Sequence, residues 1–249
     1  MPKWSLITKL MIEKLREIKI NSDWSQFDKV IQRVDSVGTH QKLQLMNYRE
    51  AEHQLSRFEN FENIANELKK NSSSGDVIEF GTWQGLGITL LAKALGSSIP
   101  RKFVGIDAFE GLPDTSTGWQ KGQFSNTSAD LCKQNILRHL NHVHKLELIE
   151  CWFDDPDLQN KIQEASENVN IIHFDCDLGD SLTTALPLIE HLLVGNNQVY
   201  LVFDDWGCYP DEIPDAFFLW ENKFSERTGI KMKKFSSSKL TRTYVVDCG

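Results

Sequence analysis

The feature that most constrains the fold is the stretch 76–87, which reads DVIEFGTWQGLG and leads into an apolar segment over 88–95. A short run of β-branched and aromatic residues is followed there by Gly81, Gly85 and Gly87. This order predicts a buried strand, a tight turn and a helix. Because glycines let a ligand approach the backbone closely, the stretch favours a nucleotide-like cofactor at the carboxyl end of a first parallel strand. An ordinary strand-to-helix connection is the alternative that this stretch alone leaves open.

The rest of the chain alternates between strand-like and helix-like segments. Strands joined by helices require right-handed crossovers, which lay the strands parallel. We therefore predict an α/β fold with a doubly wound, mostly parallel sheet and helices on both faces. Further strands are expected over 102–107, 146–150, 170–175 and 199–204, helices near 127–140, 158–165 and 181–193, and a closing antiparallel hairpin from 230–235 and 241–246.

The first 70 residues are polar and carry two amphipathic helical patterns, and a turn cluster over 71–75 separates them from the first strand. We predict that 1–70 form a helical extension and that 71–249 form the main domain. The extension could pack on the core, cover the site as a lid or mediate a dimer contact. The sequence does not choose among these roles, so a homo-oligomer is an open alternative.

The composition is that of a globular protein, since 40% of the 249 residues are hydrophobic and 25% are charged. No segment approaches the roughly 20 apolar residues of a transmembrane helix, and the N-terminus has no signal-peptide pattern. The five cysteines lack zinc or CxxC spacing, which favours a reducing, cytoplasmic location. The net charge of −8 argues against nucleic acid as a partner and suits a neutral or cationic small molecule.

Each predicted parallel strand ends in an acidic residue. Ligands of open α/β sheets bind outside the carboxyl ends of the strands, so these side chains should line one rim. The acid of the second strand, Asp107, lies 20 residues beyond Gly87. That separation is close to the one at which such an acid reaches the ribose of a bound nucleotide. The five acids are Glu79, Asp107, Glu150, Asp175 and Asp204.

Two acidic pairs follow the fourth and fifth strands, Asp175 with Asp177 and Asp204 with Asp205. If these strands are neighbours in the sheet, four carboxylates converge, which is costly unless a cation or shared protons offset their repulsion. A hard divalent ion with oxygen ligands, Mg²⁺ first of all, is the simplest explanation. The alternative for either pair alone is a solvated strand end without a ligand.

Other chemistries have less support in the sequence. Neither a nucleophile elbow of the Ser/His/Asp hydrolases nor a Walker-type phosphate loop occurs. A nicotinamide-dependent oxidoreductase is disfavoured because the glycine spacing is not GxGxxG. A glycosyltransferase could use the Asp175-Cys176-Asp177 motif, but without the glycine-rich stretch. His173 lies inside a predicted strand and is expected to be a core residue rather than a base.

Over about residues 75–218 the chain resembles the class I S-adenosylmethionine (SAM)-dependent methyltransferases, and within them the macrocin O-methyltransferase (TylF) family of sugar O-methyltransferases. The FEGLP block that follows the strand-end acid Asp107 is the most specific part of the resemblance. The matching segments are 77–85 (VIEFGTWQG), 107–113 (DAFEGLP), Phe124-Ser125, Trp152-Phe153, Asp175-Cys176-Asp177 ahead of Ser181, and 204–207 (DDWG).

The resemblance implies a Rossmann-like sheet of seven strands and a Mg²⁺-assisted transfer of a methyl group from SAM to a hydroxyl of a sugar or glycosylated metabolite. It implies Asp177, Asp204 and Asp205 as metal ligands, with Asp177 also as the candidate base. Residues from several strand ends would bind the cofactor, namely Glu79, Gly81, Thr82, Gly85, Asp107, Phe109, Ser125, Trp152 and Asp175.

Three positions depart from the family pattern. Gly179 stands where a tyrosine usually follows the acid pair, Trp206 replaces another tyrosine, and the expected arginine is missing from 209–216. These departures concern the acceptor side and leave the cofactor residues unchanged. A SAM-binding interaction protein without turnover is the alternative that they keep open.

Overall fold

A computed structural model describes residues 48–114, 119–166, 168–195, 198–207, 212–238 and 240–247. Its contacts divide the chain into two units, 1–56 and 57–249, with the boundary inside helix α3 (Tyr48–Lys70). The predicted division at residue 70 stays a prediction. Residues 1–47 of the predicted extension lie outside the described residues, and the following paragraphs concern the second unit.

A seven-stranded sheet forms the centre of this unit, in the order β3-β2-β1-β4-β5-β7-β6. The five strands from β1 to β5 pair in parallel, and β7 runs antiparallel to both of its neighbours. The predicted doubly wound, seven-stranded fold with an antiparallel C-terminal hairpin is therefore confirmed. The strands are β1 (Asp76–Phe80), β2 (Lys102–Asp107), β3 (Lys145–Glu150), β4 (Val169–Phe174), β5 (Gln198–Phe203), β6 (Met232–Ser237) and β7 (Arg242–Asp247).

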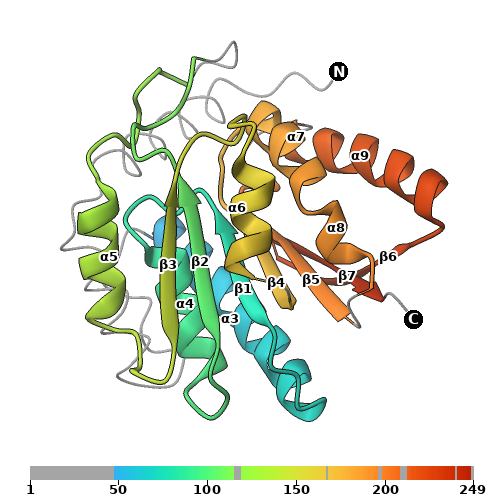
Figure 1. Ribbon diagram of the computed structural model, residues 1–249, viewed down its shortest axis with the longest axis horizontal. Helices are drawn as coiled ribbons and strands as arrows, with labels where there is room; N and C mark the ends of the chain where they lie inside the picture. Colours follow the sequence, from blue (N-terminus) through green and yellow to red (C-terminus); the bar gives the residue numbers. More distant parts are fainter. Residues whose placement is uncertain are drawn as a thin grey trace. The chain divides into compact units, whose positions relative to one another are not determined.

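Helices cover both faces of the sheet, and in Figure 1 α6 lies in front of it and α4 behind it. On one face, Ile78 and Phe80 of β1 belong to a cluster of buried side chains that continues into α6, α7, α8 and α9. On the opposite face, Phe61 of α3 packs edge-on against His173 of β4, with ring centroids 5.2 Å apart. The helices after α3 are α4 (Leu86–Leu95), α5 (Ala129–Leu137), α6 (Leu158–Ala165), α7 (Gly179–Leu188), α8 (Glu190–Leu193) and α9 (Glu212–Thr228).

Two helical regions differ from the sequence-based expectation. The helix expected over 181–193 is split into α7 and α8, and Pro187 lies in the last turn of α7. Proline has no backbone N–H and disfavours continued helix, which accounts for the break. Helix α9 was not predicted, although its buried residues Ile213, Phe217, Trp220 and Phe224 recur at helical spacing. Among the described residues, no helix is both long enough and apolar enough to cross a bilayer.

The neighbouring residues Phe217 and Phe218 of α9 offer a test of this packing. Phe217 is fully buried against Phe203 and Tyr244, whereas Phe218 is 45% exposed. We expect Phe217→Ala to lower the free energy of unfolding by about 3–5 kcal/mol, because it removes a ring from a dense core. Phe218→Ala should cost less than about 1 kcal/mol. Urea unfolding followed by circular dichroism measures both, and equal losses would contradict the assignment of the buried face.

Candidate functional site

The ends of β1, β4 and β5 lie side by side, which brings Asp175 and Asp204 to one edge of the sheet. The backbone N–H of Asp175 donates to the carbonyl of Phe80 at 2.9 Å, and the N–H of Asp204 donates to the carbonyl of Phe174 at 2.9 Å. These bonds extend the β1–β4 pairing and the β4–β5 pairing by one residue beyond the strand ends. The strand order reverses between β1 and β4, and open α/β sheets bind ligands in the crevice at such a switch point.

Backbone strain collects at the same edge. Four residues other than glycine have a positive φ just after a strand ends: Trp83 (45°), Phe109 (55°), Asp177 (60°) and Asp205 (55°). This left-handed conformation is uncommon for such residues and is most often retained at functional sites. The four loops that follow β1, β2, β4 and β5 therefore form the candidate site.

Asp107, at the tip of β2, is held by the backbone. Its two carboxylate oxygens accept hydrogen bonds from the N–H groups of Trp83 and Phe109, each at 2.7 Å. A carboxylate has about four lone-pair positions, and the backbone of Thr82 is a further donor, so the group retains capacity for another donor such as a ribose hydroxyl. Burial raises the pKa of Asp107, and the hydrogen bonds from Trp83 and Phe109 oppose this shift.

The glycines of the loop after β1 are required by protein contacts. A Cβ on Gly81 would lie 2.1 Å from the carbonyl oxygen of Asp175, and one on Gly85 would lie 2.4 Å from the side chain of Ile136. Both residues also have a positive φ, at 84° and 89°. A side chain at either position would push β1 away from β4 or α4 away from α5. These glycines thus bring the strand ends together, and their direct contact with a cofactor stays a prediction.

Glu79 points into the protein beneath helix α4. Its Oε2 lies 2.8 Å from Nδ1 of His173, and both side chains are almost fully buried. A Cβ on Gly87 would lie 2.2 Å from the same oxygen, so the carboxylate packs directly against the first turn of α4. Burial raises the pKa of Glu79, whereas the His173 hydrogen bond lowers it. The prediction of His173 as a core residue is confirmed, and Glu79 holds the strand and helix that carry the glycine loop.

The other predicted cofactor residues occupy different depths at this edge. Thr82 is 3% exposed. Its hydroxyl packs against Gly105 of β2, where an added Cβ would lie 2.7 Å from the hydroxyl oxygen. Phe109 is buried, Ser125 is exposed and Trp152 is partly buried just after β3. Their contacts with a cofactor stay predictions.

The loop that follows β2 closes onto the glycine loop, which the sequence patterns did not reveal. The indole Nε1 of Trp83 donates to Oδ1 of Asn126 at 3.2 Å, and the hydroxyl of Thr127 donates to the carbonyl of Trp83 at 3.1 Å. The ring of Phe124 packs edge-on against Trp83, with centroids 5.5 Å apart. Trp83 and Asn126 therefore join the loop after β2 to the glycine loop at this edge of the sheet.

Three carboxylates gather where β4 and β5 end. Oxygens of Asp175, Asp204 and Asp205 all lie within 4.8 Å of one another, a set that could hold a metal ion. Asp177, which the resemblance made a metal ligand, is not in this set within the part of the chain that the structure describes, although its side chain is buried nearby. Burial and the charges of Asp177, Asp175 and Asp205 raise the pKa of the Cys176 thiol, which therefore stays protonated.

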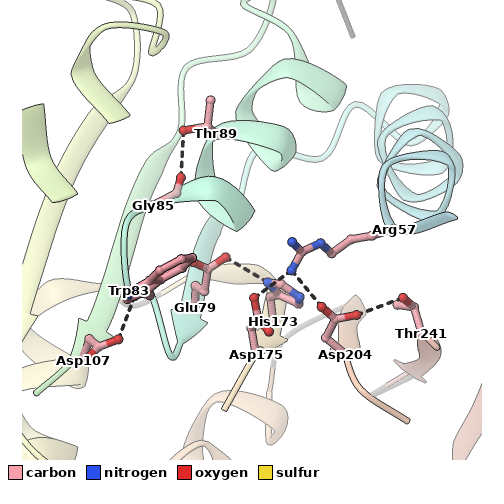
Figure 2. A network of polar contacts seen from close by, with 10 residues as sticks. All are labelled: Arg57, Glu79, Trp83, Gly85, Thr89, Asp107, His173, Asp175, Asp204 and Thr241. Carbon is pink, nitrogen blue, oxygen red and sulfur yellow. Dashed lines mark hydrogen bonds and ion pairs between the residues drawn. The ribbon is translucent and has the colours of Figure 1, made fainter. Parts of the chain in front are cut away.

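Arg57 of helix α3 supplies a positive charge to this acid cluster, as Figure 2 shows. Its Nη1 lies 2.7 Å from Oδ2 of Asp175 and 2.8 Å from Oδ2 of Asp204. Burial lowers the pKa of Arg57, but Asp204 and Asp175 outweigh that effect and raise it. Sequence reasoning missed Arg57 because 118 residues separate it from Asp175. The one available signal was an arginine among the apolar residues of an amphipathic helix.

The donor set fits a hard divalent ion, since three carboxylates with one guanidinium leave a net charge of about −2 by formal count. The edge of the sheet therefore has two neighbouring parts. Asp107 and the glycine loop lie at the ends of β2 and β1, and the carboxylates of Asp175, Asp204 and Asp205 lie at the ends of β4 and β5.

Solved structures of O-methyltransferases share this fold. NovP, an O-methyltransferase, is 15% identical with a TM-score of 0.61, covering 95% of this chain and 98% of that one. The calicheamicin methyltransferase CalS11 is 16% identical with a TM-score of 0.57, covering 100% and 95%. An apo structure of CalS11, at 14% identity, a TM-score of 0.51 and coverage of 90% and 94%, describes it as a TDP-rhamnose 3'-O-methyltransferase. An O-methyltransferase from Bacillus cereus in complex with SAH is 13% identical with a TM-score of 0.51, covering 96% and 97%.

No curated protein sequence matches the chain. The family model of the macrocin-O-methyltransferases (TylF), in contrast, matches residues 50–223, which include every strand end and loop of the candidate site up to β5. That match extends over more than half of the chain. The protein therefore belongs to the macrocin-O-methyltransferase (TylF) family, and the predicted class of SAM-dependent O-methyltransferase is confirmed.

Proposed function

We propose that the protein transfers the methyl group of SAM to a hydroxyl of a sugar or glycosylated small molecule, with assistance from Mg²⁺. The observation that carries this proposal is the adjacency of Asp107 and the carboxylates of Asp175, Asp204 and Asp205 along one edge of the sheet. A sugar-type acceptor is further supported by the similarity to CalS11, which is described as a TDP-rhamnose 3'-O-methyltransferase.

The proposed cofactor site lies across the ends of β1 and β2. Asp107 would accept a hydrogen bond from the ribose, because backbone N–H groups already orient its carboxylate and leave it acceptor capacity. SAM carries a positive sulfonium and no phosphate, which suits an acidic rim. Gly81, Gly85, Thr82, Ser125 and Trp152 would complete this pocket, with Asp175 at its border to the acid cluster.

The acid cluster would receive the acceptor. An alcohol is a poor nucleophile near neutral pH, so it must lose its proton as its oxygen attacks the methyl carbon. The O–C bond forms while the C–S bond breaks, S-adenosylhomocysteine leaves, and the proton passes to a carboxylate. Asp177 is our candidate for that base, because it is buried beside the cluster without belonging to the three closest carboxylates.

Asp175, Asp204 and Asp205 would hold the Mg²⁺ ion, in place of the set that the resemblance implied with Asp177. When bound, Mg²⁺ supplies Lewis-acid chemistry that lowers the pKa of a hydroxyl. The protein's own contribution would be to hold the acceptor oxygen, the methyl carbon and the sulfur in line, by means of the loops that carry these residues.

The cofactor site can be tested by Asp107→Asn, which keeps the shape of the side chain and removes its charge. We expect affinity for S-adenosylhomocysteine to fall at least about tenfold, since hydrogen bonds to a charged group contribute about 1.5–3 kcal/mol. Asp114→Asn, an exposed change in the same loop, is the matched control and should bind normally. Isothermal titration calorimetry measures both, and an unaltered affinity of Asp107→Asn would refute the assignment.

The same affinity should depend on pH. The pKa of Asp107 is raised above 3.8, so the carboxylate takes up a proton at a higher pH than an ordinary aspartate. Affinity for S-adenosylhomocysteine should therefore decline as the pH falls through this raised pKa and be constant at higher pH. Calorimetric titrations between pH 4 and 8, roughly the range in which native proteins persist, should show this decline in the wild type and not in Asp107→Asn.

The proposed reaction can be tested by incubating the protein with isotopically labelled SAM, Mg²⁺ and a panel of glycosides, followed by mass spectrometry. Asp177→Asn should lower kcat by about 10²–10⁴-fold, as expected for loss of a general base, while binding S-adenosylhomocysteine normally. Asp180→Asn, an exposed change in the first turn of α7, is the control. Cofactor binding without a labelled product on any hydroxylated acceptor would instead support a binding protein without turnover.

A further inference from the structure

The positive charge at the acid cluster comes from helix α3 and not from the strands that carry the carboxylates. Arg57 is 3% exposed, and its Nη1 bridges Oδ2 of Asp175 and Oδ2 of Asp204 at 2.7 and 2.8 Å. Both distances are those of charge-assisted hydrogen bonds. One nitrogen thus joins the tips of β4 and β5, as the dashed lines in Figure 2 show.

This nitrogen contacts two of the three carboxylates that would hold a metal ion. Mg²⁺ binds oxygen ligands at about 2.0–2.1 Å, so an ion shared by Asp175 and Asp204 would lie between the same two side chains. A guanidinium and a divalent ion repel each other strongly at such a separation. The other oxygen of Asp204 accepts a hydrogen bond from the hydroxyl of Thr241 at 3.1 Å, which limits rotation of the carboxylate away from Arg57.

We propose that Arg57 is a positioning residue of the acid cluster and that a divalent cation competes with it for Asp175 and Asp204. The inference rests on the metal-assisted function proposed above. Without an ion, the guanidinium offsets the repulsion of the carboxylates and keeps them together. When an ion binds, the guanidinium withdraws, and helix α3 loses one of its anchors. The affinity for metal is therefore set in part by α3.

The rest of α3 has anchors that do not involve the acid cluster. The side-chain amide of Asn60 donates to the hydroxyl of Thr243 at 2.6 Å, and Phe61 packs against His173. Ile64 and Leu68 are fully buried. Withdrawal of Arg57 should therefore loosen the helix around residues 57–59 and leave the part from Asn60 onward in place.

The first measurement is the Kd for Mn²⁺, followed by electron paramagnetic resonance, in the wild type, in Arg57→Met and in Lys69→Met. Lys69 is an exposed lysine of the same helix, so its variant loses the same charge far from the cluster. We expect Arg57→Met to bind Mn²⁺ at least about tenfold more tightly than the wild type, because the competing hydrogen bonds are gone. Lys69→Met should match the wild type.

The second measurement separates competition from a simple gain of negative charge and needs no variant. Hydrogen exchange of the wild type, with and without saturating Mg²⁺, should show faster exchange of the amides of residues 57–59 when the ion is bound. Slower or unchanged exchange there would overturn the competition, even if Arg57→Met bound Mn²⁺ more tightly. This measurement also decides the question if Arg57→Met fails to fold.

The two proposals fail in different ways. If the wild type binds Mn²⁺ and Arg57→Met binds it no more tightly, competition is refuted and the metal site stands. If neither protein binds Mn²⁺, the metal-assisted function is refuted, and the competition with it.

Discussion

The ion-pair bridge from Arg57 to Asp175 and Asp204 is the interaction on which the architecture of the site depends. The tips of β4 and β5 bring carboxylates together because the two strands are hydrogen-bonded neighbours. Such a concentration of buried negative charge is unfavourable unless a cation offsets it. Removing one partner of a buried pair typically costs about 3–5 kcal/mol, because the remaining charge has no compensation. The structure meets this requirement with a side chain from outside the sheet.

The position of the site follows from the strand order. β2 and β3 lie on one side of β1, and β4 and β5 lie on the other. At such a switch in strand order, open α/β sheets bind ligands outside the carboxyl ends of the strands. The glycine loop and Asp107 lie on one side of this crevice, and the acid cluster lies on the other. A methyl donor and a hydroxylated acceptor bound to these two parts would meet where β1 adjoins β4. Transfer of a group between them requires such proximity.

Local patterns predicted the elements of this arrangement well. The strands, the helices other than α9 and the acids at the strand ends could be read from apolar runs and their boundaries, because burial imposes a period on the sequence. The resemblance also gave the correct family. The loop glycines predicted close approach of a ligand, and the structure adds that Gly81 and Gly85 are also required by contacts with Asp175 and Ile136. A glycine in the sequence shows that a position has no side chain, but the sequence does not show which neighbouring residue leaves no room for one.

The sequence by itself determined the fold class, the rim of acids and the presence of Asp107 at the tip of the second strand, because each of these depends on residues that are close in the chain. Only the tertiary structure decided which carboxylates meet and what neutralises them. Oxygens of Asp175, Asp204 and Asp205 lie within 4.8 Å of one another, and Arg57 of helix α3 bonds Asp175 and Asp204. Electrostatic interactions act through space, so contacts between residues more than 100 positions apart leave no local pattern in the sequence.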